Sequence, residues 1–212
     1  GMEKFFPTDR IIVTGNPCRN SAVAIEGKKE EGCKEYGFDP TKKIVLIIGG
    51  SLGAKRINEL VATQIEFFKS HSLQVIWQCG ALYFEKYKKF AQEDVVVRPF
   101  VYEMEQLYAA SDLIISRAGA GSISELSCVG KPLLLIPSPN VTANHQFHNA
   151  QALVKKSAAL LLEEKELDSK FQEVFGTLIT NQSLSGDMQR ELKALARPNA
   201  VQDIIEEIID LV

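Results

Sequence analysis

Short apolar runs, separated by segments with helical spacing, divide most of the chain into alternating strands and helices. Most of these runs are continuous, which is typical of strands buried on both faces of a parallel sheet. The predicted strands are 10–15, 43–50, 73–80, 94–100, 112–119, 131–137 and 158–164. Between and after them, apolar residues recur at helical intervals. The predicted helices are 53–69, 82–91, 103–111, 122–129, 144–156, 166–180, 187–196 and 199–211.

This alternation predicts the fold class and the domain organisation. Strands joined by helices indicate an α/β fold with a Rossmann-like, doubly wound parallel sheet, followed by extra C-terminal helices. No internal domain boundary is visible, so residues 11–212 are expected to form one domain. Residues 1–10 are expected to be a cloning remnant, with Gly1 ahead of Met2, and an interdomain segment. The charged stretch 26–43 is interpreted as a solvated helix face or loop.

Composition excludes few classes of protein. The 212 residues are 45% hydrophobic and 24% charged, and the net charge of −3 gives no case for nucleic-acid binding. No apolar run approaches the length of a membrane span, and no signal peptide is visible. The spacing of the cysteines fits no zinc site, and we expect reduced, mostly buried thiols. They are Cys18, Cys33, Cys79 and Cys128.

The first glycine-rich turn, "GGSLGAKRIN" (49–58), joins a strand to a helix. Ligands bind beyond the carboxyl ends of strands in doubly wound sheets, and amides at a helix start attract anions. The turn is not a P-loop, because no Gly-Lys-Ser/Thr follows at the required spacing. The alternative is an ordinary strand–helix turn in which Ser51 caps the helix.

The second turn, "SRAGAGSISEL" (116–126), is an incomplete dinucleotide fingerprint. Ser124 stands where the third glycine belongs, and no acid occurs between Glu125 and Glu163 to hold a ribose at the next strand. Two interpretations of Glu125 stay open. Ser122 and Glu125 form a capping box that orders the helix start, or Glu125 accepts hydrogen bonds from the ribose hydroxyls of a bound nucleotide.

A third polar cluster opens the helix predicted at 144–156. It consists of Asn144, His145, Gln146, His148 and Asn149. The two histidines have no third ligand in view, so a metal site is disfavoured. Amides and imidazoles without an acid suit the hydroxyls of a sugar, and the alternative is a polar first helical turn.

Five motifs in order carry a resemblance to a known family. They are "GNPCR" (15–19), "GGSLGA" (49–54), "RAGAGSISEL" (117–126), "GKPLLLIPSP" (130–139) and "NHQFHNA" (144–150). Together they resemble the C-terminal half of the MurG family, the peptidoglycan N-acetylglucosaminyltransferases, from about residue 10 to the end. The resemblance implies the C-terminal domain of a GT-B glycosyltransferase, the half that holds UDP-GlcNAc.

The same resemblance implies a role for each site residue. Arg19 and Ser51 would lie near the diphosphate, which the amides of Ala120, Gly121 and Ser122 would cap. Phe100 and Val101 would frame the uracil, the latter through its backbone, with Met104 beside it. Glu125 would take the ribose hydroxyls. Gln146, with Asn149 nearby, would reach the GlcNAc hydroxyls, and His145 stands where better-known members have a glutamine.

The implied reaction is inverting transfer of GlcNAc from UDP-GlcNAc to the C4 hydroxyl of undecaprenyl-diphospho-MurNAc-pentapeptide, which converts lipid I to lipid II. No D-x-D occurs, which agrees with chemistry that requires no metal or other cofactor. We expect a bacterial enzyme, peripheral on the cytoplasmic side of the inner membrane. The N-terminal domain with the acceptor site, the membrane-docking patch and the general base is expected to be missing, so the fragment itself should be soluble and inactive.

Other functions stay open at this point. They are another GT-B enzyme, such as a UDP-GlcNAc 2-epimerase or UDP-glycosyltransferase, a binding-only donor subunit of a two-chain GlcNAc-transferase, and a Rossmann-like regulator that binds some nucleotide. The tail "NAVQDIIEEIIDLV" (199–212) carries an apolar stripe. The stripe packs either on the domain's own core or towards the absent N-terminal domain.

Overall fold

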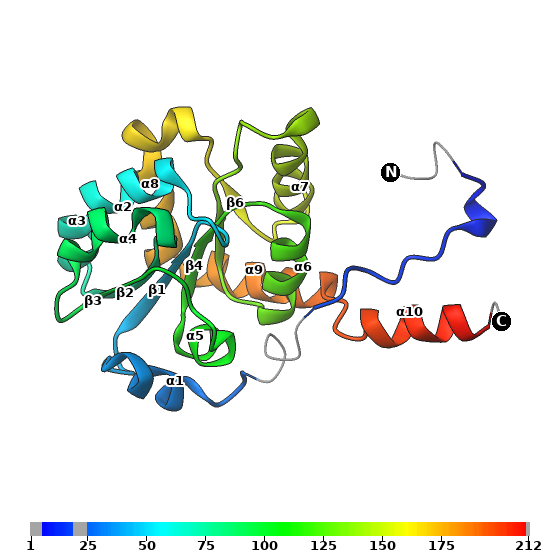
Figure 1. Ribbon diagram of the computed structural model, residues 1–212, viewed down its shortest axis with the longest axis horizontal. Helices are drawn as coiled ribbons and strands as arrows, with labels where there is room; N and C mark the ends of the chain where they lie inside the picture. Colours follow the sequence, from blue (N-terminus) through cyan, green and yellow to red (C-terminus); the bar gives the residue numbers. More distant parts are fainter. Residues whose placement is uncertain (1–5, 19–24, 211–212) are drawn as a thin grey trace.

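A parallel sheet forms the centre of the computed structural model, which describes residues 6–18 and 25–210. Within these ranges six strands pair side by side in the order β3-β2-β1-β4-β5-β6, all parallel (Figure 1). This order reverses between β1 and β4, as in a doubly wound sheet. The strands are β1 (Lys43–Ile48), β2 (Leu73–Gln78), β3 (Val95–Arg98), β4 (Leu113–Ser116), β5 (Leu133–Leu135) and β6 (Leu160–Leu161). The predicted fold class is therefore confirmed.

Helices connect the strands and cover the sheet. Aromatic rings join α3 to α8, where Phe68 packs edge-on against Phe171 and Phe175. Two further pairs pack together, α1 with α5 and α6 with α9. The helices are α1 (Lys29–Tyr36), α2 (Lys55–Thr63), α3 (Ile65–Ser70), α4 (Ala81–Tyr87), α5 (Met104–Ala110), α6 (Ala120–Val129), α7 (His145–Val154), α8 (Leu167–Thr180), α9 (Gln182–Leu195) and α10 (Ala200–Ile209).

A buried polar link joins α2 to the end of β2. The indole Nε1 of Trp77 donates to Asn58 Oδ1 at 2.9 Å, and Asn58 Nδ2 donates to the carbonyl of Cys79 at 2.8 Å. Trp77 and Asn58 are almost fully buried. Because both polar groups of the amide are satisfied, the link costs little to bury. It fixes the helix that follows the first glycine-rich turn.

Several predicted boundaries were wrong. Residues 10–15 form no strand: a short 3-10 turn at Thr8–Arg10 is followed by irregular backbone. Ile12 and Val13 are 62% and 72% exposed, because this apolar run pairs with no strand of the sheet. The helix predicted at 53–69 is two helices, α2 and α3. Helix α9 begins at Gln182, five residues early, because Asn181 Oδ1 caps it by accepting from the Leu184 amide.

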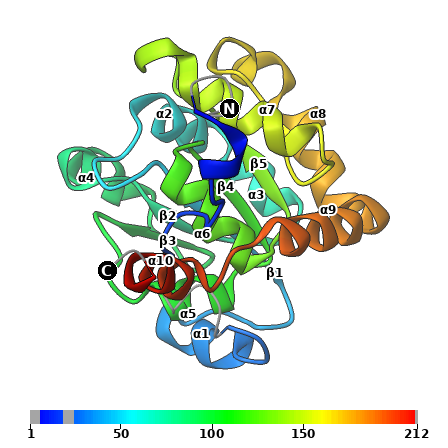
Figure 2. The same cartoon turned by 90° about the vertical axis from the view of Figure 1, so that its right-hand side faces the viewer.

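The last helix extends away from the sheet on the same side as residues 6–18 (Figures 1 and 2). Only Ala200 of α10 is buried. Its apolar side chains Val201, Ile205, Ile208 and Ile209 are between 44% and 66% exposed, so packing on the domain's own core is the wrong alternative. Among the described residues, no helix is both long and apolar enough to cross a membrane.

Candidate functional site

Two adjoining cavities lie beyond the carboxyl ends of the central strands. The smaller, of about 150 Å³, extends from the end of β1 at Ile48 to the first turns of α6. The larger, of about 590 Å³, lies between the turn 49–54 and the start of α7. Gly50 and Ser51 line both cavities, so the first glycine-rich turn forms the wall between them.

The smaller cavity collects residues from four distant segments of the sequence. Five of the predicted site residues line it: Ser51, Phe100, Met104, Ser122 and Glu125. Phe100 and Met104 supply an apolar side, and the ring of Phe100 packs edge-on against Tyr102 at 4.8 Å. Opposite polar groups come from α6. One flat apolar wall facing hydroxyl and carboxylate groups is suited to a planar ring attached to a sugar.

Glu125 is not part of a capping box. Helix α6 begins at Ala120, its N-cap is Gly119, and no side chain caps it. Ser122 is therefore the third residue inside the helix, and Glu125 lies one turn further along. Glu125 Oε1 is the buried side-chain polar atom that has no hydrogen-bond partner among the described residues. A buried, unpaired carboxylate oxygen in a cavity wall indicates a ligand that donates to it.

The amino end of α6 presents free backbone donors. The first bond of the helix is Ile123 N–H to Gly119 O at 2.9 Å. The amides of Ala120, Gly121 and Ser122 precede it and bond to no other residue within 6–18 or 25–210. A Cβ on Gly121 would meet nothing within 4 Å, so the approach is open. Such amides, at the positive end of the helix dipole, favour an anion.

The turn 49–54 is shaped by its glycines and does not use Ser51 as a cap. Helix α2 begins at Lys55 with Ala54 as N-cap, so the capping alternative for Ser51 was wrong. Gly53 has φ +77°, and a Cβ there would lie 2.1 Å from the Cys79 carbonyl oxygen. Only glycine fits that approach. Gln78 Nε2 donates to the Gly50 carbonyl at 3.2 Å. Ser51, the next residue, is exposed where it lines the two cavities.

The larger cavity is lined by ion pairs. Arg117 pairs with Glu164, both largely buried, and its Nη1 donates to the Ile136 carbonyl at 3.0 Å. Arg56 pairs with Asp168 at 2.6 Å, and that hydrogen bond lowers the pKa of Asp168. Because these guanidinium groups are already paired, they stiffen the walls more than they add net positive charge.

Two side chains of the third polar cluster form hydrogen bonds to the backbone of two segments, one just before α6 and one after β5. Gln146 Oε1 accepts from the amides of Ser138 at 2.9 Å and Ala118 at 3.3 Å. Asn149 Nδ2 donates to the Ala118 carbonyl at 3.1 Å. Gln146 lines the larger cavity, and its Nε2 keeps its donors for a ligand. These amides thus hold the second glycine-rich turn against α7.

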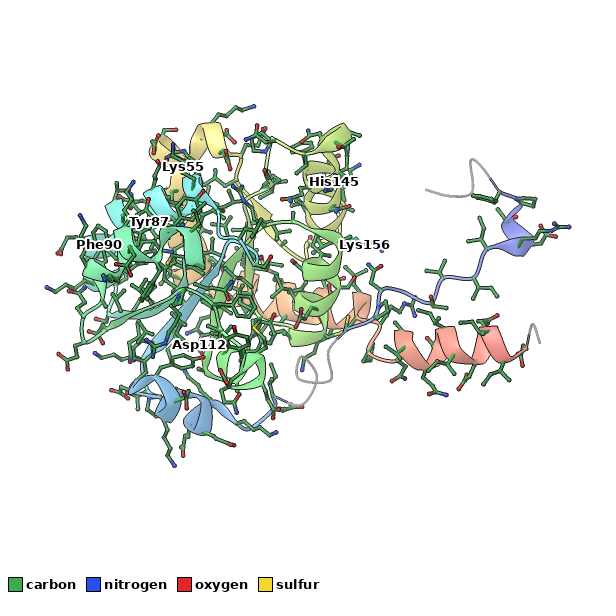
Figure 3. The ribbon with its side chains drawn as sticks, in the orientation of Figure 1. Lys55, Tyr87, Phe90, Asp112, His145 and Lys156 are labelled. Carbon is green, nitrogen blue, oxygen red and sulfur yellow. The ribbon has the colours of Figure 1, made fainter. Side chains whose placement is uncertain are left out.

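His145, labelled in Figure 3, is the exposed first residue of α7, and its Nδ1 lies 3.0 Å from the Thr142 carbonyl. The linings of the two cavities do not include His145, Asn149, Val101, Ala120 or Gly121. The Val101 side chain is buried. No group of three or more metal-ligating side chains occurs within the described part of the chain.

Arg19 lies outside the described residues, but the segment before it lies against α6. Asn16 Nδ2 donates to Ser124 Oγ at 2.9 Å. Burial, together with the neighbouring Cys128 thiol, raises the pKa of Cys18 to about 11. Asn16 and Cys18 of that motif therefore lie beside the helix that carries Glu125.

Sequence reasoning missed three residues that shape this site. Gln78 and Ser116 end apolar strands and line the smaller cavity, and Arg117 follows β4 and lines the larger one. A polar side chain at the carboxyl end of a buried strand is the signal that could have found them. In "LQVIWQCG" and "DLIISRAG" that signal is present.

Comparison with known proteins assigns a family to this geometry. Residues 44–208 match the family described as glycosyltransferase family 28 C-terminal domain. A protein of Flavobacterium psychrophilum, named UDP-N-acetylglucosamine–N-acetylmuramyl-(pentapeptide) pyrophosphoryl-undecaprenol N-acetylglucosamine transferase, is 50% identical over all of this chain and 58% of its own length. A Bacteroides fragilis protein of the same name is 41% identical over 57% of its length. The chain thus spans somewhat more than half the length of these relatives.

Solved structures show the same fold. The crystal structure of Acinetobacter baumannii MurG matches 89% of this chain and 55% of its own, with a TM-score of 0.71 and 27% identity. A structure of S. aureus MnaA with UDP matches all of this chain and 58% of its own, with a TM-score of 0.69. At 14% identity the second likeness shows the fold alone.

Proposed function

The chain belongs to the glycosyltransferase family 28 C-terminal domain family, and from that premise we propose that it is the donor-binding half of a GlcNAc-transferase of peptidoglycan synthesis. The donor is UDP-GlcNAc and the acceptor is lipid I, whose C4 hydroxyl takes the sugar. The observation that carries the proposal is the buried, unpaired Oε1 of Glu125 in a cavity with an apolar wall.

The uridine occupies the smaller cavity. Its uracil packs on Phe100 and Met104, with the backbone of Val101 at its edge. The ribose hydroxyls donate to Glu125, whose carboxylate accepts from both at once. This arrangement supplies the partner that Oε1 lacks among the described residues and selects a nucleotide with a free 2′-hydroxyl.

The diphosphate lies at the amino end of α6, between the two cavities. The amides of Ala120, Gly121 and Ser122 point at it, and Ser51 and Arg19 approach from the other motifs. Negative charge builds up on the diphosphate as UDP leaves. Fixed amide dipoles placed there stabilise that charge without rearranging, which lowers the barrier to transfer.

The GlcNAc extends into the larger cavity. Gln146 Oε1 already accepts from two backbone amides, so its Nε2 is the group that donates to a sugar hydroxyl. Asn149 acts through Ala118, holding the turn in place, and His145 meets the sugar or diphosphate from the rim. The walls made by Arg117 and Glu164 leave room for a hexose.

The acceptor side belongs to a longer protein. This chain covers only 57–58% of the relatives that carry the transferase name, so we expect the isolated chain to bind donor without transferring sugar. The general base and the acceptor site lie outside these residues. The whole enzyme works without a metal cofactor at the cytoplasmic face of the bacterial inner membrane, as a peripheral protein.

The exposed apolar face of α10 supports the proposal that this chain is part of a longer protein. Residues 11–212 form the donor domain, and the apolar side chains of α10 pack on the preceding domain of the longer protein. Their exposure of 44% to 66% here leaves an apolar surface available for it.

Calorimetric titration of the chain with UDP-GlcNAc, UDP-GalNAc, UDP and ADP tests the proposal. We expect UDP-GlcNAc to bind more tightly than UDP-GalNAc, and both uridine compounds to bind where ADP does not. Equal affinity for UDP and ADP would instead indicate a general nucleotide-binding domain. Lipid II formation by the isolated chain would contradict its assignment as the donor half alone.

A further inference from the structure

A separate cavity, of about 520 Å³, lies near the amino end of β5. Its walls come from the segment before α1, the C-terminal end of α6, the start of the β5 strand region and one face of α9. Lys131 precedes β5 by two residues, whereas the donor site lies beyond the carboxyl ends of the strands. Asp112, which precedes β4, lies far from Lys55 and His145 in Figure 3.

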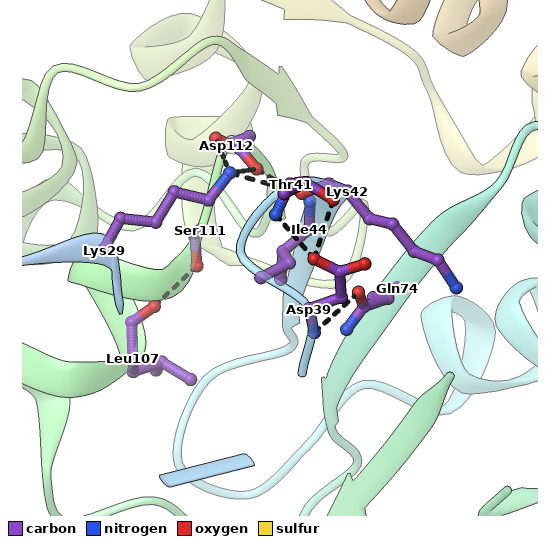
Figure 4. A network of polar contacts seen from close by, with 9 residues as sticks. All are labelled: Lys29, Asp39, Thr41, Lys42, Ile44, Gln74, Leu107, Ser111 and Asp112. Atoms are coloured by element: carbon purple, nitrogen blue, oxygen red, sulfur yellow. Dashed lines mark hydrogen bonds and ion pairs between the residues drawn. The ribbon is translucent and has the colours of Figure 1, made fainter. Parts of the chain in front are cut away.

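Cationic side chains dominate this cavity. Its lining holds Lys29, Lys131, Arg190 and Lys193 against one carboxylate, Glu26. Lys29 is already paired: its Nζ lies 2.8 Å from Asp112 Oδ2, and the same carboxylate accepts from the Ile44 amide (Figure 4). Arg190 is paired with Asp187 at 2.7 Å. Two of the four positive charges are therefore balanced by neighbouring carboxylates.

Lys131 and Lys193 have no such balance. Neither makes a hydrogen bond or ion pair with any residue in the ranges 6–18 and 25–210. Both line the same cavity, and the stem of Lys193 packs on Gly130, the residue before Lys131, where an added Cβ would lie 3.0 Å from Lys193 Cγ. Lys131 is half-buried. Burial lowers the pKa of Lys131. The charge of Asp112 raises that pKa, and the charges of Lys29 and Lys193 lower it.

We propose that this cavity is a second anion site, which binds a phosphate-bearing compound between Lys131 and Lys193. A half-buried ammonium without a direct ion-pair partner is unfavourable, so an entering anion is stabilised by both groups. A phosphate monoester carries a charge of about −2, which matches two unpaired ammonium groups. The cavity is larger than one phosphate, so the ligand is a phosphorylated compound or a lipid phosphate headgroup. The site does not depend on the donor function.

Nuclear magnetic resonance of the 15N-labelled chain tests the site with pyrophosphate as the probe. The amides of Gly27, Gly130 and Gly186 report on this cavity, and that of Gly50 reports on the donor site. We expect the first three to shift together. Lys131→Met and Lys193→Met should each weaken that binding by at least about tenfold, because each removes a charge-assisted contact. Lys155→Met is the control, because Lys155 is an exposed residue directly after α7. This substitution should leave pyrophosphate binding unchanged.

A parallel arm separates the two sources of phosphate. Vesicles of phosphatidylcholine, with and without one third phosphatidylglycerol, are floated with the chain and each variant. Gly130 shifts without flotation identify a soluble compound, and flotation that both lysine variants abolish identifies a headgroup. The thermal midpoints of both variants should stay at or above that of the unsubstituted chain, since each loses an unpaired charge. Absence of both signals, or signals that the two variants leave unchanged, overturns the proposal.

Discussion

Replacing Glu125 by methionine should separate stability from binding. The carboxylate oxygen Oε1 is buried without a partner, and such a group costs about 1–3 kcal/mol of stability. Methionine has similar size and helix propensity but no polar atom to bury. The free energy of unfolding of Glu125→Met without ligand should therefore equal or exceed that of the unsubstituted chain. A capping box would give the opposite sign, a loss of about 1 kcal/mol.

The same substitution should weaken nucleotide binding. Each hydrogen bond to a charged acceptor contributes about 1.5–3 kcal/mol, so loss of the 2′ contact alone lowers UDP affinity by about 10- to 150-fold. Glu125→Met removes the 3′ contact as well and should lower the affinity by at least that much. Calorimetry with UDP and 2′-deoxy-UDP measures this, and urea denaturation measures stability. The unsubstituted chain should bind 2′-deoxy-UDP more weakly than UDP. The variant should bind the two compounds equally, because the contact that the deoxy compound lacks is already absent from the variant.

Glu173→Met is the matched control, since Glu173 is an exposed carboxylate on α8, remote from both cavities. Glu173→Met should change neither the free energy of unfolding nor the affinity for UDP. A Glu125→Met variant that binds UDP within twofold of the unsubstituted chain would refute the role of Glu125. So would a deoxy penalty of the same size in both proteins.

Three further predictions concern the walls of the site and the segment beside α6. Ser122→Ala should change the free energy of unfolding by less than about 0.5 kcal/mol in urea denaturation, because Gly119 and not Ser122 is the N-cap; a loss above 1 kcal/mol would restore the capping box. Arg117→Met should cost about 3 kcal/mol in the same assay, because it leaves Glu164 buried without its partner, and Arg117→Met/Glu164→Met should recover much of that loss. Because folding raises the pKa of Cys18 from 9.0 to about 11, the folded chain holds this proton more tightly, and the resulting stability is lost as pH rises from 9 through 11. The rate at which iodoacetamide modifies Cys18, followed by mass spectrometry of the peptide, should accordingly keep rising steeply between pH 9.5 and pH 11; a rate that levels off near pH 10, as it does for a thiol with a pKa of 9.0, would contradict the raised pKa.

The sheet could be predicted because its strands are buried on both faces. Continuous apolar runs such as 43–50 and 73–80 leave few other structures, and they correspond to β1 and β2. The run at 10–15 has the same composition but no partner strand, and Ile12 and Val13 remain exposed. Apolar content alone does not tell whether a sheet edge is available, because that depends on distant segments.

The site residues stay a prediction, although residues of both glycine turns line one cavity together with Phe100, Met104 and Glu125. The start of α6 was wrong by two residues, because the pattern at 122–125 satisfies a capping box whether or not the helix begins there. Gln78 and Arg117 were missed since their partners, the Gly50 carbonyl and Glu164, come from other segments. Local sequence specifies the turns, but tertiary contacts decide which polar groups stay unpaired.

A crystal structure of the chain with UDP-GlcNAc tests the central claim most directly. The quantity to measure is the distance from Glu125 Oε1 to the ribose hydroxyl oxygens. We expect about 2.5–2.7 Å, the length of a charge-assisted O–H···O⁻ bond, with the diphosphate on the amides of Ala120, Gly121 and Ser122. A nucleotide bound elsewhere, or a ribose that leaves Oε1 without a partner, would contradict the account.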